Sequence, residues 1–313
     1  MKTVFHGRVA VSILTLALGA GSAWAQGQND QGPIRQADDN SSKISVHETN
    51  PIETAPTKGG TGALSPILPH SGVVMVAPKA YLIWYGNWNQ SNASDTPAGQ
   101  AIVRDFLHGI GPTPYYSINT TYKGVTGSVT VAGETTVTAS SRSRLSDSGV
   151  QNIVTNVIKS GVFGPADPDG VYFVLTSSDV AKSGFCTQYC GWHTAATINN
   201  TTVKYSFVGN ANRCLNACAA QTVGPNGNAG VDGMVSVVAH ELEETNTDPN
   251  LTAWYDSSGN ENADKCAWTF GQNMTLGSNG AYYNMSFGGR NYLIQRNLSA
   301  ADNKCYVALN GGQ

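Results

Sequence analysis

One histidine and two glutamates that could bind a metal fall within a single short stretch, His240-Glu241-Leu242-Glu243-Glu244. Successive residues of an α-helix are rotated by about 100°, so His240 and Glu244 would lie one turn apart on the same helix face. The spacing is that of the H-E-x-x-H zinc helix, with Glu244 in place of the second histidine. The pattern predicts a metal site in which His240 and Glu244 are ligands and Glu241 is a general base.

Zinc is the first choice of cofactor, because it accepts imidazole nitrogen and carboxylate oxygen. A bound zinc ion lowers the pKa of its water and polarises a carbonyl group, so a peptide or ester bond is the expected target. The second carboxylate hardens the site and would favour another divalent cation such as Mn²⁺ or Ca²⁺. The alternative is an ordinary amphipathic helix whose charged face is solvated.

Catalytic zinc needs a third protein ligand. Asp264 and His193 are the first choices, and Asp248 and Glu261 are weaker candidates. Asp248 follows the helix directly, whereas Glu261 and Asp264 come after a turn at residues 257–259. The alternative for His193 is a hydrogen-bonded structural histidine. For Glu261 and Asp264 the alternative is a solvated turn or a bound structural cation.

The apolar periodicity along the chain predicts a single domain of the α/β (α+β) class with a mixed β-sheet, in which the metal-site helix is zincin-like. Strands are expected at 73–76, 80–85, 171–175 and 203–208, with two or three more within 115–139. Helices are expected at 97–108, 148–160 and 233–247. Asp232 is the expected N-cap of the last helix, and Pro249 ends it.

The N-terminal sequence predicts a secretory signal. Lys2 and Arg8 precede an apolar run over residues 9–20, and Ala23-Trp24-Ala25 offers small residues at the cleavage site. We therefore expect a signal peptide over residues 1–25, a flexible leader over 26–72 that is rich in Gln, Asn, Ser, Pro and Gly, and a domain over 73–313. The mature protein is expected to be secreted or periplasmic.

The composition agrees with a soluble exported protein. A net charge of −3 and 12% charged residues argue against a nucleic-acid partner. No stretch after the signal is apolar for long enough to span a membrane.

Six cysteines remain after the signal is removed, an even number in an oxidising compartment. Their spacing suggests two local pairs, Cys186–Cys190 and Cys214–Cys218, and a third bond, Cys266–Cys305. Sequence alone leaves 15 connectivities open. The alternative is a metal site built from the two C-x-x-x-C pairs.

Several segments together resemble the phosphate-induced protein (EXORDIUM-like) family. They are 81–88, 171–180, 190–193, 225–234, 263–266 and 289–296, and the resemblance covers nearly all of residues 73–310 in order. It implies export and a helix with His, Glu and a second Glu where His240, Glu241 and Glu244 stand. It implies no particular enzymatic activity. The signal peptide is of a bacterial type, so the growth role of plant members is not carried over.

Two functions are therefore expected as alternatives. The first is a secreted metal-dependent hydrolase, most readily a peptidase. The second is a non-catalytic binding or signalling protein that contacts a cell-wall polymer and holds a structural metal or none. Trp84, Tyr85 and Trp88 could stack on sugars in that case, although aromatic residues in an apolar strand usually belong to a core. The sequence has no Gly-x-Ser-x-Gly nucleophile elbow and no phosphate-binding loop.

Overall fold

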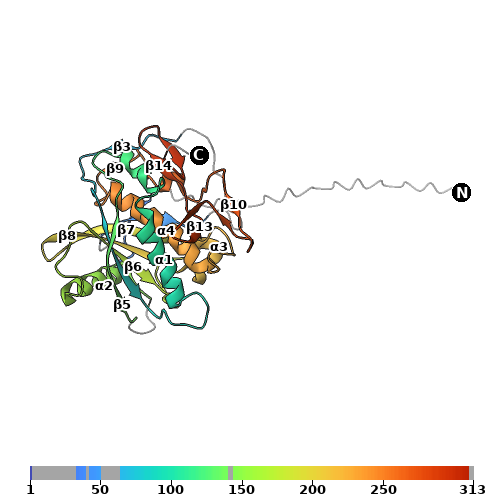
Figure 1. Ribbon diagram of the computed structural model, residues 1–313, viewed down its shortest axis with the longest axis horizontal. Coiled ribbons are helices and arrows are strands. Elements are labelled where there is room, and N and C mark those ends of the chain that lie inside the picture. Colours follow the sequence, from blue (N-terminus) through green and yellow to red (C-terminus); the bar gives the residue numbers. More distant parts are fainter. Residues whose placement is uncertain (2–32, 40–41, 51–63, 140–143, 310–313) are drawn as a thin grey trace. The chain divides into compact units, whose positions relative to one another are not determined.

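A seven-stranded mixed sheet forms the centre of the fold (Figure 1). The computed structural model describes Met1 and residues 33–39, 42–50, 64–139 and 144–309, so the predicted signal peptide lies, apart from Met1, outside the described residues. The strands follow the order β1 (Ile34–Gln36), β2 (Lys43–Glu48), β7 (Tyr189–Ile198), β8 (Thr201–Gly209), β6 (Gly170–Thr176), β4 (Lys79–Tyr85) and β5 (Thr130–Val137). Strands β8, β6, β4 and β5 are parallel, whereas β7 is antiparallel to both β8 and β2. The predicted mixed sheet is confirmed.

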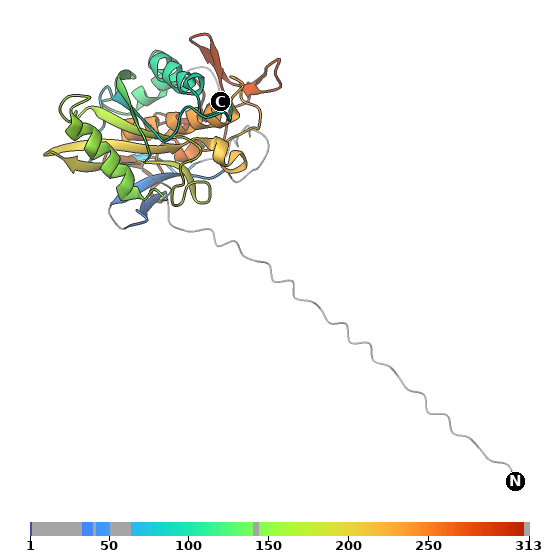
Figure 2. The same ribbon diagram turned by 90° about the horizontal axis from the view of Figure 1, so that it is seen from below.

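The inner parallel strands are covered on both faces. Every residue of β6 is buried, and in β4 all but Lys79 are. Near-continuous apolar runs of this kind are typical of parallel strands under helices. The chain leaves β4 through helix α1 (Pro97–Ile110) to β5 and returns through helix α2 (Asp147–Ser160) to β6. Because β5 and β6 flank β4, right-handed crossovers place α1 and α2 on opposite faces of the sheet (Figure 2).

Local signals set the ends of these two helices. The Thr96 side chain accepts a hydrogen bond from the backbone N–H of Gly99 (3.0 Å), and Ser146 does the same for Gly149 (3.0 Å). Such caps satisfy backbone donors that have no partner within the helix. Gly161 ends α2 with a φ of 74°, a left-handed conformation that favours glycine.

The helix that carries the predicted metal ligands is longer than expected. Helix α4 runs over Ala229–Thr247 and packs against α1, β7 and β8. Its N-cap is Asn228, whose side chain accepts from the N–H of Val231 (3.2 Å), so the prediction that Asp232 caps it is wrong. Asp232 instead accepts hydrogen bonds from Asn226. The helix ends before Asp248 and Pro249, as predicted.

Three other segments differ from the sequence prediction. Residues 73–76 form no strand, and the stretch 115–139 holds a 3-10 helix (Tyr116–Thr121) and β5 rather than two or three strands. Part of the expected leader, residues 26–72, lies in the sheet as β1 and β2. Ile44 and Val46 of β2 are buried, which explains why this polar-looking stretch joins the core.

Short elements complete the described chain. They are helix α3 (Leu215–Cys218), the 3-10 helices Ala211–Arg213 and Asp264–Cys266, and strands β3 (Leu68–Pro69), β9 (Trp254–Tyr255), β10 (Thr275–Leu276), β11 (Tyr282–Tyr283), β12 (Met285–Phe287), β13 (Arg290–Tyr292), β14 (Asn297–Ser299) and β15 (Lys304–Tyr306). Within the described ranges, none of the helices has the length and apolar character that a bilayer crossing needs.

The disulfides connect elements rather than neighbouring residues. Bonds join Cys186 to Cys214 and Cys190 to Cys218, each across a sequence separation of 28. The predicted local pairs, Cys186–Cys190 and Cys214–Cys218, are therefore wrong. Cys186 lies before β7 and Cys190 lies on it, whereas Cys214 and Cys218 lie at the two ends of the short helix Leu215–Cys218, so both bonds tie the start of β7 to this helix. The predicted Cys266–Cys305 bond is confirmed.

Digestion with trypsin tests the crossed pairing. Cleavage after Lys182, Lys204, Arg213 and Lys265 gives peptides 183–204 and 214–265, each with two cysteines. We expect mass spectrometry without reduction to find both peptides as one covalently linked species that separates when reductant is added. Two separate peptides, each with an internal disulfide, would contradict the pairing.

Candidate metal centre

The charged face of α4 is withdrawn from water. His240 is 1% exposed, and Glu241 and Glu244 are fully buried at 0%. The alternative of a solvated amphipathic helix is therefore excluded. These side chains face strand β7 and the segment that runs from β9 to the 3-10 helix Asp264–Cys266.

A first group of donors forms around His193 of β7. Its Nδ1 lies 3.3 Å from Glu241 Oε2 and 3.5 Å from Glu244 Oε2, and its Nε2 lies 3.6 Å from Glu261 Oε1. Gly191 makes this approach of helix and strand possible. A Cβ atom there would meet Val237 Cγ1 at 2.6 Å and Glu241 Oε1 at 2.8 Å. Residues two apart on a strand share a face, so the absence of a side chain at Gly191 lets α4 close over His193.

A second group forms around His240. Its Nε2 lies 2.9 Å from Glu244 Oε1 and 3.5 Å from Asp264 Oδ1. The backbone N–H of Asp264 donates to Glu244 Oε1 (3.0 Å), and Asp264 Oδ2 accepts from the N–H of Glu261 (3.0 Å). The structure thus brings both preferred third ligands, Asp264 and His193, to the helix, together with Glu261.

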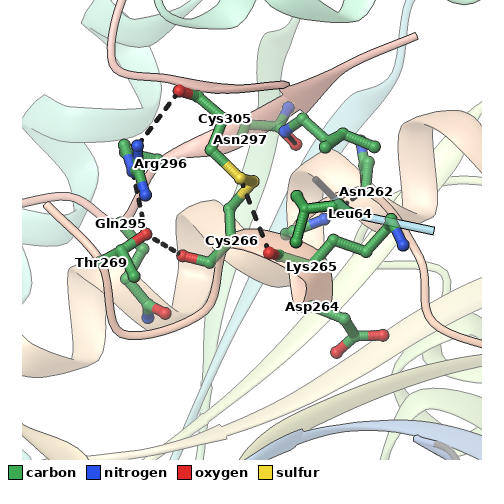
Figure 3. The surroundings of a disulfide bond; sticks show 12 residues. Leu64, Asn262, Asp264, Lys265, Cys266, Thr269, Gln295, Arg296, Asn297 and Cys305 are labelled. Carbon is green, nitrogen blue, oxygen red and sulfur yellow. Dashed lines mark hydrogen bonds between the residues drawn. A yellow bond between two sulfur atoms is a disulfide. The ribbon is translucent and has the colours of Figure 1, made fainter. Parts of the chain in front are cut away.

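The Cys266–Cys305 disulfide holds the segment that carries Asp264 (Figure 3). The Asp264 carboxylate points away from the sulfur atoms. On the far side of the bond, Arg296 donates from Nε to Thr269 Oγ1 (3.0 Å) and from Nη1 to the carbonyl of Cys305 (3.4 Å). The position of Asp264 is therefore fixed covalently two residues away.

Asp248 lies outside both groups. Its Oδ1 accepts from the backbone N–H groups of Thr252 (2.5 Å) and Ala253 (2.7 Å), which shapes the turn after α4. Its Oδ2 is buried and has no hydrogen-bond partner among the described residues.

Carboxylates dominate the electrostatics of the two imidazoles. Burial alone would lower the pKa of His193, but Glu261 and the two α4 glutamates raise it well above its ordinary value. Burial opposes protonation of His240 as well, yet the charge of Glu244 and the contact with Asp264 raise its pKa to about 10.

The pKa values of the carboxyl groups shift in two directions. Burial would raise the pKa of Glu244, but the two imidazoles lower it far below its ordinary value. Burial raises the pKa of Glu241 to about 7, and burial together with the Glu244 charge raises that of Asp264 to about 7. For Glu261 burial raises the pKa well above its usual range.

Several donor atoms of the centre lack a partner. In the part of the chain that the structure describes, Glu244 Oε2, both Glu261 oxygens and His193 Nε2 are buried and accept or donate no hydrogen bond. Nor does any described Lys or Arg lie within 4.0 Å of these carboxylates. A buried charge without a partner is costly, whereas imidazole and carboxylate donors suit zinc and harder divalent cations. The residues present therefore fit a divalent cation.

A layer of polar residues around the donors was not foreseen from the sequence. The ring of His47, on β2, lies 3.8 Å from that of His240 and stacks on Trp268 at 4.9 Å. Burial and the nearby His240 lower the pKa of His47 well below its usual value. His47 was not identified from the sequence because it lies within the expected leader. Only the pairing of β2 with β7, which is far along the chain, brings it to the centre.

Glu243 points to a different polar cluster. Its Oε2 accepts from Asn297 Nδ2 (2.9 Å), and the same Asn297 donates to Asn119 (2.9 Å). Burial raises the pKa of Glu243 well above its ordinary value. The sequence does not indicate these partners of Glu243.

The aromatic residues expected to stack on sugars are in the core. Trp84 is 2% exposed, Tyr85 8% and Trp88 5%. The Trp84 indole donates to Glu134 (2.9 Å), and that of Trp88 donates to the carbonyl of Leu175 (3.2 Å). The alternative of a glycan-stacking surface is therefore excluded, and the core position that an apolar strand favours is confirmed.

The shifted pKa values predict that the metal-free protein loses stability as pH rises. His240, with a folded pKa of about 10 against an ordinary 6.5, contributes fully below pH 6.5 and progressively less up to pH 10. Glu241 and Asp264, raised to about 7 from 4.5 and 3.8, retain protons in the folded state and add to the same trend. Glu244 does not oppose it, because its lowered pKa contributes fully above 4.5.

Thermal melting in the presence of a chelator measures this trend. We expect Tm to fall by at least about 4 °C between pH 5 and pH 9, since roughly 2–4 °C corresponds to 1 kcal/mol for a domain of this size. Excess zinc should reduce the fall, because metal ions bind the deprotonated ligands. A chelated protein whose Tm is level or rises over this range would contradict the assigned shifts.

Comparison with known proteins identifies the family. Residues 68–308 match the family model described as the phosphate-induced protein 1 conserved region. Protein EXORDIUM-like 3 of Arabidopsis thaliana is 32% identical over 257 residues, covering 68% of this chain and 74% of its own. EXORDIUM-like 5 of the same plant is 30% identical over 276 residues (72% and 73%), and PHOSPHATE-INDUCED 1 of Nicotiana tabacum is 27% identical over 285 residues (75% and 86%). No solved structure matches the chain. The match over most of its length shows that the chain belongs to the phosphate-induced protein family.

Proposed function

We propose that this protein is an exported metal-binding member of its family, in which the buried centre around Glu244 holds a divalent cation, with zinc as the first choice. The observation that carries the proposal is the set of unpartnered, fully buried donor atoms on His193, Glu244 and Glu261. Side chains that fold out of water without a partner need compensation. A cation bound between them would supply it.

The same residues suggest what the cation does for the fold. His193 comes from the sheet, His240 and Glu244 from α4, and Asp264 from the disulfide-bonded segment. A metal bound by groups from three elements converts its binding free energy into folding free energy. Glu241 contacts Nδ1 of His193, which is how a carboxylate orients a metal-binding imidazole.

Export is part of the proposal. Three disulfides suit an oxidising compartment, and the N-terminal sequence suggests a signal peptide that ends at Ala25. The bacterial type of that signal, and a peptide or cell-wall polymer as partner, stay predictions. N-terminal sequencing of the protein recovered from outside the cytoplasm would find Gln26 first if the cleavage site is right.

Elemental analysis tests the metal centre directly. We expect purified protein to contain at least one divalent cation per chain, and the His240→Ala variant to lose at least half of it because a ligand is removed. The Asp232→Asn variant is the matched control, since this buried carboxyl lies on the same helix but outside both donor groups. Removal of the metal should lower Tm by more than about 5 °C.

The absence of a bound metal would be visible in the same measurements. Protein that is purified without metal, and whose Tm does not change when zinc, manganese or calcium is added, would contradict the proposal.

A second candidate is hydrolysis of a peptide or ester bond, and the position of Glu241 favours it. Its pKa of about 7 suits a general base, because proton transfer is most efficient when the pKa lies near the working pH. A bound zinc ion would supply Lewis acidity and an acidic water molecule. Glu241 would accept the proton of that water. The Asp264 side chain is 9% exposed and the other donor residues are buried, so a substrate could reach them only if the segment around Glu261 and Asp264 moved.

The Glu241→Gln variant separates the two roles of this residue. If Glu241 is a base, any hydrolysis of peptide or ester substrates should fall by about 10²–10⁴-fold while the metal content stays unchanged. If Glu241 only orients His193, metal affinity should fall by about 10–100-fold. Hydrolysis that survives Glu241→Gln undiminished would rule out the catalytic role.

A further inference from the structure

The two donor groups share one residue. One group consists of His193, Glu244 and Glu261, and the other of His240, Glu244 and Asp264. Within each group, one ligand atom per residue can be chosen so that all lie within 4.8 Å of one another. From this geometry we infer that the centre is dinuclear, with two divalent cations bridged by the Glu244 carboxylate. The inference rests on the proposed metal-binding function.

The two oxygens of Glu244 are directed to different groups. Oε1 lies 2.9 Å from His240 Nε2, whereas Oε2 lies 3.5 Å from His193 Nδ1. A carboxylate that binds a single ion would be expected near one imidazole ligand, whereas each oxygen of Glu244 lies near a different imidazole. The two histidines also come from different elements, β7 and α4, so each brings its own ligand set to the shared acid.

The supply of donors exceeds what one zinc ion takes. Zinc in proteins is almost always bound by four ligands, and five residues already converge here. Both oxygens of Glu261 and Oε2 of Glu244 have no hydrogen-bond partner in the described chain. One cation in the His240 group would leave Glu261 uncompensated, because it contacts only the ring of His193 among the charged groups described.

The charge balance points the same way. Four carboxyl groups meet at the centre: Glu241, Glu244 and Glu261, which are fully buried, and Asp264, whose side chain is 9% exposed. No described Lys or Arg forms an ion pair with them. If these four are ionised and the imidazoles are neutral, one divalent cation leaves two negative charges and two cations leave none. Buried charge of one sign is strongly unfavourable, so a second cation relieves a large part of the remaining repulsion.

The contacts of His193 suit a metal ligand. Its Nδ1 lies 3.3 Å from Glu241 Oε2 and 3.5 Å from Glu244 Oε2, and its Nε2 faces Glu261 and has no hydrogen-bond partner among the described residues. A metal-binding histidine commonly directs its second ring nitrogen to a carboxylate. Glu241 is therefore a positioning residue for the first ion. Paired cations are the arrangement that several classes of hydrolase use to bind attacking and leaving oxygens.

Metal stoichiometry decides between one ion and two. The full-length mature protein would be stripped with chelator, dialysed against zinc and analysed for zinc per chain. We expect about two ions for the unchanged protein and for the Asp232→Asn control. We expect about one for Glu261→Gln and one for Asp264→Asn, because each variant removes a ligand of a single group. Glu244→Gln should retain fewer than one.

A spectroscopic measurement needs no variant and so does not depend on variant folding. Protein loaded with Mn²⁺ should show exchange coupling between two spins by electron paramagnetic resonance, because a bridging carboxylate couples them. In Glu261→Gln the signal should become that of a single uncoupled ion.

The outcomes separate the two proposals. A single ion per chain with no spin coupling would overturn the dinuclear inference and leave the proposed metal-binding function standing. Two ions without coupling would overturn the bridging role of Glu244. No bound metal in the unchanged protein would overturn both.

Discussion

Removal of the charged face of α4 from water is the constraint on which the rest of the structure depends. Taking a carboxylate into a protein interior costs several kcal/mol unless other groups compensate it. Here several carboxylates are buried side by side, and Glu244 sits at the middle of them. The neighbouring elements supply or hold groups that can compensate these buried carboxylates. Strand β7 supplies an imidazole, the segment after β9 supplies further donors, and the disulfide Cys266–Cys305 holds that segment in place.

The sheet makes the burial possible. A helix that presents acids on one face and apolar residues on the other can be buried all round only where a second layer accepts each face. Val235, Val238 and Leu242 join the apolar core, and Gly191 lets the acidic face lie close to β7. Asn297 accommodates Glu243 by donating a hydrogen bond to its carboxylate, and it also donates to Asn119. The scaffold thus gives each charged side chain of α4 a separate environment.

Local pattern predicted much of the site, and long-range pairing accounts for what it missed. The spacing of His240 and Glu244 depends only on helix geometry, so it could be predicted from five residues. Asp264 and His193 could be chosen because metal ligands must come from somewhere near the helix. The strand that carries His47 could not be foreseen, because its composition is polar and its partner strand is about 145 residues away.

The disulfide pairing failed for a related reason. Short sequence spacing suggests a closed loop, but the fold brings the start of β7 beside the helix Leu215–Cys218, and each cysteine of one segment pairs with a cysteine of the other. The N-cap of α4 was misplaced because Asp232 is as good a capping residue as Asn228, and only the surrounding hydrogen bonds distinguish them.

The place of β2 at the margin of the sheet has a consequence for maturation. Ser45 lies opposite His193, and His47 opposite Gly191. A proteolytic cut after Glu48 would therefore separate β1 and β2 from the rest of the chain and leave β7 as an unpaired edge beside the metal centre. Any processing enzyme that trims this N-terminus has to stop before Ile34 if both strands are to stay in the sheet.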